Sequence, residues 1–339
     1  MAAILEDSAP VWVAPMAGGP SRPELVIAAA QTGHMAQLAG GYKTPEKLAD
    51  EIAAVRAAGV ELFGVNLFVP NVHEVDPDAY DAYARALAAD AERVGATLDA
   101  PITEDDDAWA AKLALLVEDP VPVVSFTFGL PDEADIAALR RAGSITIQTV
   151  TSAYEAARAE AAGVDLLVVQ GPDAGGHSGV WAAGQLPGSE PLEALIADVR
   201  GATGMPIVAA GGVSSRAGVE SALEAGASAV AVGTVVLRSP ESGASVAHRA
   251  ALADPRFTDT ALTRAFTGRP ARALRNDFLD AHDAGAPVGY PAIHHLTKGL
   301  RAAATAQGDL ERIHLWAGTG WRDATERPVA EILADLLPR

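Results

Sequence analysis

The sequence predicts an α/β fold in which eight parallel strands close into a barrel around one core. The first observation is a series of eight short runs of apolar and β-branched residues, which are typical of strands buried on both faces. The second is that alanine-rich stretches with helical periodicity lie between these runs. The third is a recurrent glycine at the end of the helical stretches. This alternation indicates repeated βα units.

The predicted elements follow one another in regular order along the chain. The predicted strands are Val11–Ala14, His34–Leu38, Leu62–Leu67, Pro122–Phe126, Ser144–Gln148, Asp165–Val169, Pro206–Ala209 and Ser228–Val232. The predicted helices are Glu24–Thr32, Pro45–Ala57, Glu133–Ala142, Ala153–Ala162, Pro191–Ala202 and Ser215–Ala225. Since a barrel with one elaboration accommodates 339 residues, these elements predict a TIM (β/α)8 barrel.

Two regions of the sequence are not accounted for by the strands and helices of a simple barrel. Residues 70–119 add two acidic, helix-patterned stretches between the third and fourth strands, and residues 254–339 follow the eighth strand. Long insertions at the mouth of a barrel commonly carry function. We therefore predict a barrel from residues 1–69 and 120–253, and an accessory, mainly helical cap domain from residues 70–119 and 254–339.

Composition limits the classes of partner. The formal charge of −19 disfavours nucleic acid and anionic membrane surfaces, because both would be repelled by the mean field of the protein. The absence of cysteine excludes disulfides, thiolate nucleophiles and cysteine-ligated metals. The first residues lack the basic start and apolar run of a signal peptide, so we expect a cytoplasmic protein. The sequence leaves open whether two copies pair as a homodimer.

Two glycine turns follow the last two predicted strands. They are Gly211-Gly212-Val213-Ser214 and Gly233-Thr234. In TIM barrels a phosphate commonly binds after these strands, because glycine lets backbone N–H groups approach an anion. The alternative is a pair of tight turns that hold no ligand.

A histidine stands in a glycine-rich segment after the sixth predicted strand. The segment runs from Gln170 to Gly179 and places His177 directly after Gly175 and Gly176. At the carboxyl end of a barrel strand, this arrangement favours an imidazole that faces a ligand over a surface histidine. We expect no metal, because no second histidine or carboxylate pair lies at a familiar ligand spacing.

Two further segments end strands early in the chain. Ala14-Pro15-Met16-Ala17-Gly18-Gly19 closes the first strand, and Gly64-Val65-Asn66-Leu67 closes the third. Asn66 offers a donor and an acceptor to the edge of a heterocycle, and the backbone at Met16 suits a flat ring. Taken alone, each of these two signals favours a packing role over contact with a ligand.

Together, these sequence segments resemble those of the nitronate monooxygenase family over nearly the whole chain. Ser125-Phe126-Thr127-Phe128-Gly129 adds to the match, and the segment from Ala174 to Gly179 is shared with flavin-dependent enoyl reductases. The late segments Tyr290–Arg301 and Trp316–Gly320 resemble the class I enzymes of the family. Asp173 departs from the family pattern, which leaves the substrate preference open.

The resemblance implies an FMN cofactor and a set of residues around it. The residues implied to hold FMN are Pro15, Met16, Ala17, Gly18, Asn66, Gln170, Gly175, Gly176, Gly211, Gly212, Gly233 and Thr234. His177 is implied to face the reactive side of the flavin. If their segment is helical, Tyr290, His294 and Lys298, spaced four apart, would share one face of the helix and could turn toward the substrate.

The implied reaction is oxidation of an alkyl nitronate, such as propionate 3-nitronate, by O2 to a carbonyl compound with nitrite or nitrate. A nitronate is an anion, so it needs a cationic or donor-rich pocket, for which His177 and Lys298 are the candidates. One alternative is an FMN-dependent NAD(P)H reductase of enoyl thioesters or quinones. Another is a flavin-free lyase or isomerase whose glycine turns bind a substrate phosphate.

Overall fold

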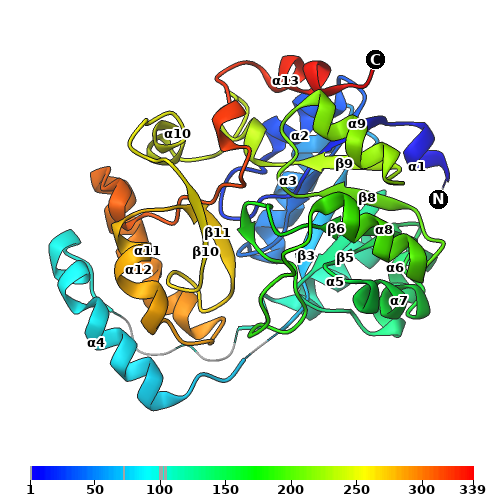
Figure 1. The fold of residues 1–339 in the computed structure, drawn as a ribbon. Helices are drawn as coiled ribbons and strands as arrows, with labels where there is room; N and C mark the ends of the chain where they lie inside the picture. Colours follow the sequence, from blue (N-terminus) through cyan, green and yellow to red (C-terminus); the bar gives the residue numbers. More distant parts are fainter. Residues whose placement is uncertain (1, 72, 99–101, 103–104) are drawn as a thin grey trace.

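The computed structural model describes residues 2–71, 73–98, 102 and 105–339 and contains a closed barrel of eight parallel strands. The strand order is β1-β2-β3-β4-β5-β6-β8-β9, with β1 paired to β9 to close the ring (Figure 1). The barrel strands are β1 (Ala9–Val13), β2 (His34–Ala39), β3 (Gly64–Phe68), β4 (Val123–Thr127), β5 (Ile145–Val150), β6 (Leu166–Gln170), β8 (Ile207–Ala210) and β9 (Ala229–Val232). The predicted TIM barrel is confirmed, with strand ends shifted by one or two residues.

Side chains fill both sides of the barrel wall. Along β1, Trp12 packs inside with Met35 and Val208, whereas Val11 and Val13 belong to the outer layer beneath the helices. This division follows from the alternation of side chains along a strand. It explains why the strands read as continuous apolar runs, since both of their faces are buried.

The helices around the barrel include the six predicted segments, with ends shifted by at most two residues. They are α1 (Ala2–Glu6), α2 (Pro23–Ala30), α3 (Pro45–Ala57), α5 (Trp109–Glu118), α6 (Glu133–Ala142), α7 (Ala153–Ala161), α8 (Leu192–Ala202), α9 (Arg216–Glu224) and α13 (Val329–Leu336). The side chains of Thr44, Ser152 and Ser215 accept hydrogen bonds from the first turns of α3, α7 and α9. Gly143 ends α6 with a φ of 105°, in the left-handed region that favours glycine.

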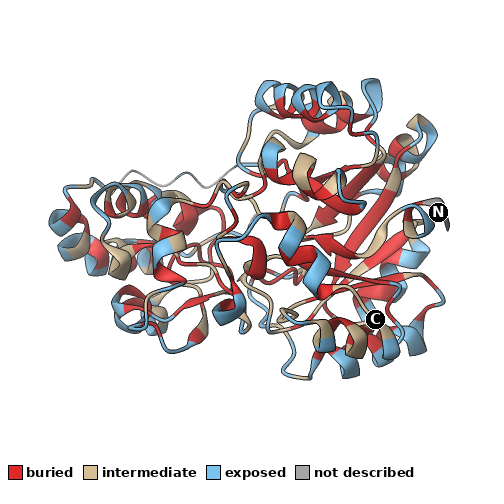
Figure 2. Ribbon diagram, turned by 90° about the horizontal axis from the view of Figure 1, so that it is seen from above, coloured by how far each residue is buried: buried red, intermediate tan, exposed pale blue. Residues whose placement is uncertain are grey.

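A second body packs over one end of the barrel and has its own apolar core. It contains α4 (Pro77–Val94), α10 (Val246–Ala251), α11 (Asp277–His282), α12 (Ala292–Gln307), β10 (Thr260–Thr263) and β11 (Ala271–Leu274). Short 3-10 turns lie at Thr234–Val236, Asp283–Gly285, Leu310–Arg312 and Trp321–Asp323. Helix α4 lies along α12, although residues 94 and 292 are far apart in sequence (Figure 1). Figure 2 shows buried segments in both bodies.

Two helices assigned by sequence to the cap pack on the barrel instead. Helix α5 contacts α3 and α6, and its Leu113 and Leu116 lie in the barrel's outer core. Helix α13 contacts α2 and α9, and its Val329 and Leu333 belong to the same core. Both helices expose one face and bury an apolar stripe, and the barrel offers the nearest apolar surface. The predicted cap boundaries at 70–119 and 254–339 were therefore too wide at α5 and α13.

A small three-stranded sheet, β10-β11-β7, joins the two bodies and fixes the position of the histidine segment that follows β6. Strand β7 (Gly176–His177) pairs antiparallel with β11, with His177 opposite Ala271. The loop after β6 is thereby fixed to the second body by backbone hydrogen bonds. Among the described residues, no helix is both long enough and apolar enough to cross a membrane.

Candidate active site

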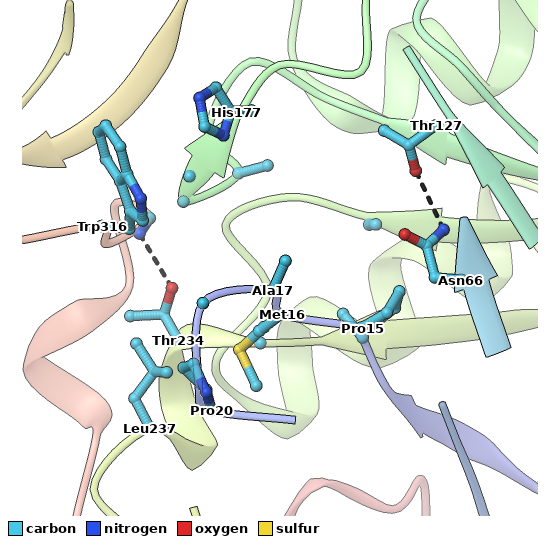
Figure 3. A pocket seen from close by; sticks show the side chains of 18 of the residues that line it. Pro15, Met16, Ala17, Pro20, Asn66, Thr127, His177, Thr234, Leu237 and Trp316 are labelled. Atoms are coloured by element: carbon cyan, nitrogen blue, oxygen red, sulfur yellow. Dashed lines mark hydrogen bonds between the residues drawn. The ribbon is translucent and has the colours of Figure 1, made fainter. Parts of the chain in front are cut away.

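A cavity of about 490 Å³ opens at the carboxyl ends of the barrel strands, beneath the second body. Figure 3 shows Asn66 and Thr127 on one side and Trp316 and Thr234 on the other, with His177 and the 15–17 segment between them. The predicted site residues that line it are Pro15, Met16, Ala17, Gly18, Asn66, Gln170, Gly175, Gly176, His177, Gly211, Gly212, Gly233, Thr234, His294 and Lys298. Tyr290 is the one predicted residue that does not line it.

The glycine turn after β8 has the geometry of an anion cradle. Gly211 and Gly212 have φ values of 116° and 76°, which residues with a Cβ rarely adopt. A Cβ on Gly212 would lie 2.8 Å from the Cβ of Asp173. Within the described part of the chain, no acceptor takes the N–H groups of Gly212 and Val213. Free amides just before the start of α9 suit a phosphate.

The turn after β9 adds a hydroxyl. Thr234 Oγ1 accepts a hydrogen bond of 2.9 Å from the N–H of Gly318, which leaves its own proton free to donate (Figure 3). A Cβ on Gly233 would lie 3.3 Å from Met16 Sδ. Glycine at this position therefore leaves space for the Met16 side chain.

Asn66 is oriented by the neighbouring strand. Its Nδ2 lies 2.9 Å from Ser125 Oγ and 3.1 Å from Thr127 Oγ1, and it donates to both. The residue is 3% exposed, and its Oδ1 is left as the acceptor that faces the cavity. An acceptor fixed in this way matches an imide N–H on a flat heterocycle.

Two predicted cofactor residues have their polar groups already engaged by the protein. Gln170 Oε1 accepts from the Gly179 N–H at 2.6 Å, and its Nε2 donates to the His177 carbonyl at 3.3 Å. The N–H of Met16 donates to Ser21 Oγ at 2.8 Å. Gln170 thus braces the histidine loop, and Met16 offers packing rather than a free amide.

The imidazole of His177 contacts aromatic rings and the hydroxyl group of one threonine. Its imidazole packs 5.3 Å from Trp316 and 5.6 Å from Phe128 between ring centroids. Its Nε2 lies 2.9 Å from Thr267 Oγ1. Burial, together with the positive charges of Arg269 and Arg301, lowers the pKa of His177 to about 3. At neutral pH His177 is therefore an uncharged imidazole and not the cation that an anionic substrate requires.

Helix α12 supplies the opposite wall. His294 and Lys298 face the cavity from successive turns, and the His294 ring stacks on Tyr42 at 4.5 Å. Burial, reinforced by Arg301, holds the pKa of His294 well below its usual value. Lys298 is exposed and has no partner among the described residues.

Tyr290 does not share the helical face predicted for it. Helix α12 begins at Ala292, after Pro291, so the spacing of four from Tyr290 to His294 does not span helical turns. The Tyr290 ring packs 5.9 Å from Phe128, 6.2 Å from His177 and 6.0 Å from His294 between ring centroids, and it does not line the cavity.

Several residues of the site were missed by sequence reasoning. They are Thr267, Arg269, Arg301, His314 and Trp316, of which all but Arg269 line the cavity. Arg269 is fully buried and stacks on the ring of Phe128, with its guanidinium carbon 4.2 Å from the ring centroid. Arg301 had a usable signal, because it lies three residues after Lys298 and seven after His294.

Comparisons with known proteins agree with this geometry. A model of the nitronate monooxygenase family matches residues 2–339. A probable nitronate monooxygenase from Staphylococcus aureus strain Newman is 34% identical, with 97% of this chain and 93% of that protein covered.

Solved structures are similar over the same length. The crystal structure of nitroalkane oxidase from Streptomyces ansochromogenes superposes with a TM-score of 0.93 and 44% identity, covering 98% of this chain and 96% of that one. FabK from Thermotoga maritima superposes with a TM-score of 0.76 and 26% identity, covering 98% and 93%. Since the family model and a curated relative both span almost the whole chain, this protein belongs to the nitronate monooxygenase family of oxidoreductases.

Proposed function

We propose that this protein is an FMN-dependent oxidase of small alkyl nitronates, such as propionate 3-nitronate. O2 would be the second substrate, and the products would be a carbonyl compound with nitrite or nitrate. The observation that carries the proposal is an uncharged imidazole, His177, facing a cavity whose opposite wall presents Lys298 and Arg301. Such a cavity suits an anion that is oxidised beside a neutral base.

The residues of the barrel mouth fit FMN. The free amides of Gly212 and Val213 and the hydroxyl of Thr234 would hold its phosphate. Asn66 Oδ1 would accept from the edge of the ring, and the 15–18 segment would pack against it. When bound, FMN supplies the electron transfer from substrate to O2, while the protein supplies orientation and charge.

The contacts of Thr267 indicate which nitrogen of His177 takes a proton. The Thr267 hydroxyl donates its one proton to the carbonyl oxygen of Arg269 at 3.2 Å. The 2.9 Å bond to His177 then requires Nε2 to be the donor. Nδ1 is then left unprotonated, since the hydrogen bond of the imidazole to a described residue is made by Nε2. We infer that Nδ1 removes the α-proton when a neutral nitroalkane is the substrate.

Thr267→Val should remove the hydroxyl that fixes the protonated nitrogen of His177, while it keeps a side chain of similar volume. We expect kcat with 1-nitropropane to fall by about 10-fold, because either ring nitrogen can then carry the proton. Propyl 1-nitronate, which needs no deprotonation, should be affected less than 3-fold. Thr267→Ser should restore the nitroalkane rate. Equal losses with both substrates would show that Thr267 acts only on structure.

Lys298→Met should weaken the capture of an anionic substrate. Lys298 is exposed to solvent, so its attraction is screened, and we expect KM for a nitronate to rise by about 2- to 5-fold with kcat nearly unchanged. Steady-state kinetics at low ionic strength measure this effect. An unaltered KM would remove Lys298 from the substrate pocket.

The proposed function is tested by the products formed in air. The purified protein mixed with propionate 3-nitronate should consume O2 and release nitrite or nitrate at a rate far above that of free FMN. If a flavin-containing preparation forms none of these products above the FMN control, the proposal fails.

An FMN-dependent NAD(P)H reductase is the second candidate, because the chain also superposes on FabK with a TM-score of 0.76. A reductase would consume NADH in the presence of a quinone or an enoyl thioester. The two candidates are separated by which reagent reduces the flavin.

A further inference from the structure

The loop after β2 carries a strained residue at the edge of the cavity. Tyr42 lines the cavity and has a φ of 65°, in the left-handed region that favours glycine. Such a conformation costs free energy and persists only where the surrounding structure holds it. Among the described residues, four that are not glycine have a positive φ; they are Tyr42, Asp107, Ala108 and Phe128. Three of these four lie at one junction, where the segment before α5 meets the loop after β2.

Asp107 supplies the contact that holds Tyr42. Its Oδ1 accepts a hydrogen bond of 2.9 Å from the N–H of Tyr42, across 65 residues of sequence. Its Oδ2 lies 2.8 Å from Nζ of Lys112 on α5, and the Lys112 side chain is 1% exposed. The ion pair is therefore nearly sealed from water. The carboxylate cannot turn away from Tyr42 without leaving a buried ammonium unpaired, which is costly.

The ring of Tyr42 joins the barrel to the second body. It stacks on His294 of α12, with centroids 4.5 Å apart and planes 4° from parallel, and it meets Phe68 of β3 edge-on at 5.4 Å. Both His294 and Phe68 line the cavity. The loop passes close to β3, because a Cβ on Gly41 would clash with the ring of Phe68. A change in the backbone of Tyr42 would therefore displace a ring that contacts both bodies at the cavity.

The segment before α5 also reaches α12 directly. Asp105 Oδ2 lies 2.9 Å from Nε2 of His295, and Asp105 Oδ1 accepts a hydrogen bond of 2.9 Å from the N–H of Asp107. The segment thus contacts the residue next to His294 as well as the barrel loop that carries Tyr42. These contacts place Asp107 between the two bodies, although it does not itself line the cavity.

We propose that Asp107, held by Lys112, is a positioning residue for the reaction at the barrel mouth. Its carboxylate keeps Tyr42 in the left-handed conformation that seats the ring on His294 as part of the cavity wall. A buried ion pair adds little net stability, because the desolvation of two charges offsets much of their attraction. A carboxylate that holds a strained residue at a cavity instead indicates a role in shaping the wall. The effect on the reaction rests on the proposed function, whereas the contact itself does not.

The test compares two double variants that both lack the ion pair. Lys112→Met removes the buried ammonium in each, so that no charge is left unpaired. Asp107→Asn keeps an oxygen that accepts from Tyr42, whereas Asp107→Gly removes it and still tolerates the φ of 55° at this position. In hydrogen exchange, the Tyr42 amide should exchange at least about 10-fold faster in the glycine double variant and within about 3-fold of wild type in the asparagine double variant.

Kinetics decide whether the contact serves the reaction. With propionate 3-nitronate, the glycine double variant should raise KM by about 5- to 10-fold, because the wall that confines the substrate is displaced, and the asparagine double variant by less than about 3-fold. Acrylamide should quench the fluorescence of the bound flavin at least about 2-fold more efficiently in the glycine double variant, because the displaced wall admits solvent. A purely structural role would lower the amount of folded enzyme, and therefore kcat, without changing KM.

A double-mutant cycle tests whether Asp107 acts through Tyr42. Tyr42→Gly removes the ring and needs no acceptor to adopt the left-handed conformation. With Lys112→Met present throughout, Asp107→Gly should raise KM by less than about 2-fold further once Tyr42 is glycine, because both changes remove the same wall. Independent effects that multiply would show that Asp107 acts by another route and would overturn the inference.

A control variant removes an ion pair at the other end of the same helix. Arg56 Nη1 lies 2.6 Å from Asp119 Oδ2, directly after α5, and both side chains are partly exposed. Arg56→Met with Asp119→Asn should leave the exchange of the Tyr42 amide, KM and flavin quenching unchanged. Neither residue lines the cavity.

Each remaining outcome also decides the inference. If the glycine double variant does not fold, Lys112→Met alone takes its place: the carboxylate is then free to turn toward solvent, and both the Tyr42 exchange rate and KM should rise by at least about 2-fold. Unchanged exchange, or faster exchange with an unchanged KM, overturns the inference. If a flavin-containing preparation oxidises no nitronate, the proposed function fails, and Tyr42 exchange together with flavin quenching still decides whether Asp107 positions the wall.

Discussion

His177→Ala should retain bound flavin but lose most of its turnover. With a neutral nitroalkane, removal of the proton acceptor should lower kcat by about 10²- to 10⁴-fold, the usual contribution of a positioned base. With a nitronate, which is already deprotonated, we expect a loss of about 10-fold from misplaced substrate. The flavin should stay bound because its predicted contacts come from glycine turns and Asn66. Unchanged steady-state rates with a nitronate would contradict the placement of His177 at the reacting end.

The pH dependence of the wild-type enzyme offers a second check on His177. Burial, with Arg269 and Arg301, lowers its pKa from 6.5 to about 3, so the residue stays unprotonated as the pH falls through 6.5. We expect kcat/KM with 1-nitropropane to remain flat from about pH 8 to about pH 5. A decline centred near pH 6.5 would show that His177 titrates as an ordinary histidine.

Gly175→Ala should disrupt the junction between the histidine loop and the C-terminal segment. A Cβ at this position would lie 2.6 Å from the carbonyl carbon of Ala317 and would also meet the Gly318 nitrogen. Both neighbours are backbone, so neither can rotate away, and the chain itself must shift at a cost of about 1–3 kcal/mol. Because Gly318 donates to Thr234 and Gly175 precedes His177, we expect weaker flavin binding together with lower thermal stability.

The matched control is Gly201→Ala on α8. A Cβ there would meet nothing within 4 Å, and helical alanine should raise stability by about 0.5–1 kcal/mol. Thermal unfolding and flavin fluorescence of the two variants measure the contrast. If Gly175→Ala unfolds at the same temperature as Gly201→Ala and keeps its flavin, the close contact with the C-terminal segment is not part of the site.

The barrel could be predicted from sequence because its signals are local. Strands buried on both faces read as apolar runs, as residues 166–169 and Ala229–Val232 do, and several of the helices between them carry their own caps. Once the strands are placed, parallel order brings their carboxyl ends together at one mouth. The loops that carry Asn66, His177 and Gly212 are located by that topology without knowledge of any side-chain contact.

The second body was predicted less well because its contacts join distant segments. Thr267 reaches His177 across 90 residues, and nothing near either residue indicates the pairing. Arg301 lies on the same helical face as Lys298, but the sequence alone does not tell which part of the fold that face packs against. Tyr290 was misplaced because the start of α12 at Ala292 breaks the assumed helical spacing. Helices α5 and α13 were assigned by chain position, whereas their apolar stripes pack on the barrel.

The central claim is that the barrel mouth holds a flavin that takes electrons from a nitronate. The most direct measurement is an absorbance spectrum of the purified protein, followed by anaerobic mixing with propionate 3-nitronate and, separately, with NADH. We expect a flavin spectrum that is bleached rapidly by the nitronate and only slowly, if at all, by NADH. A colourless protein, or a flavin bleached rapidly by NADH alone, would contradict the account.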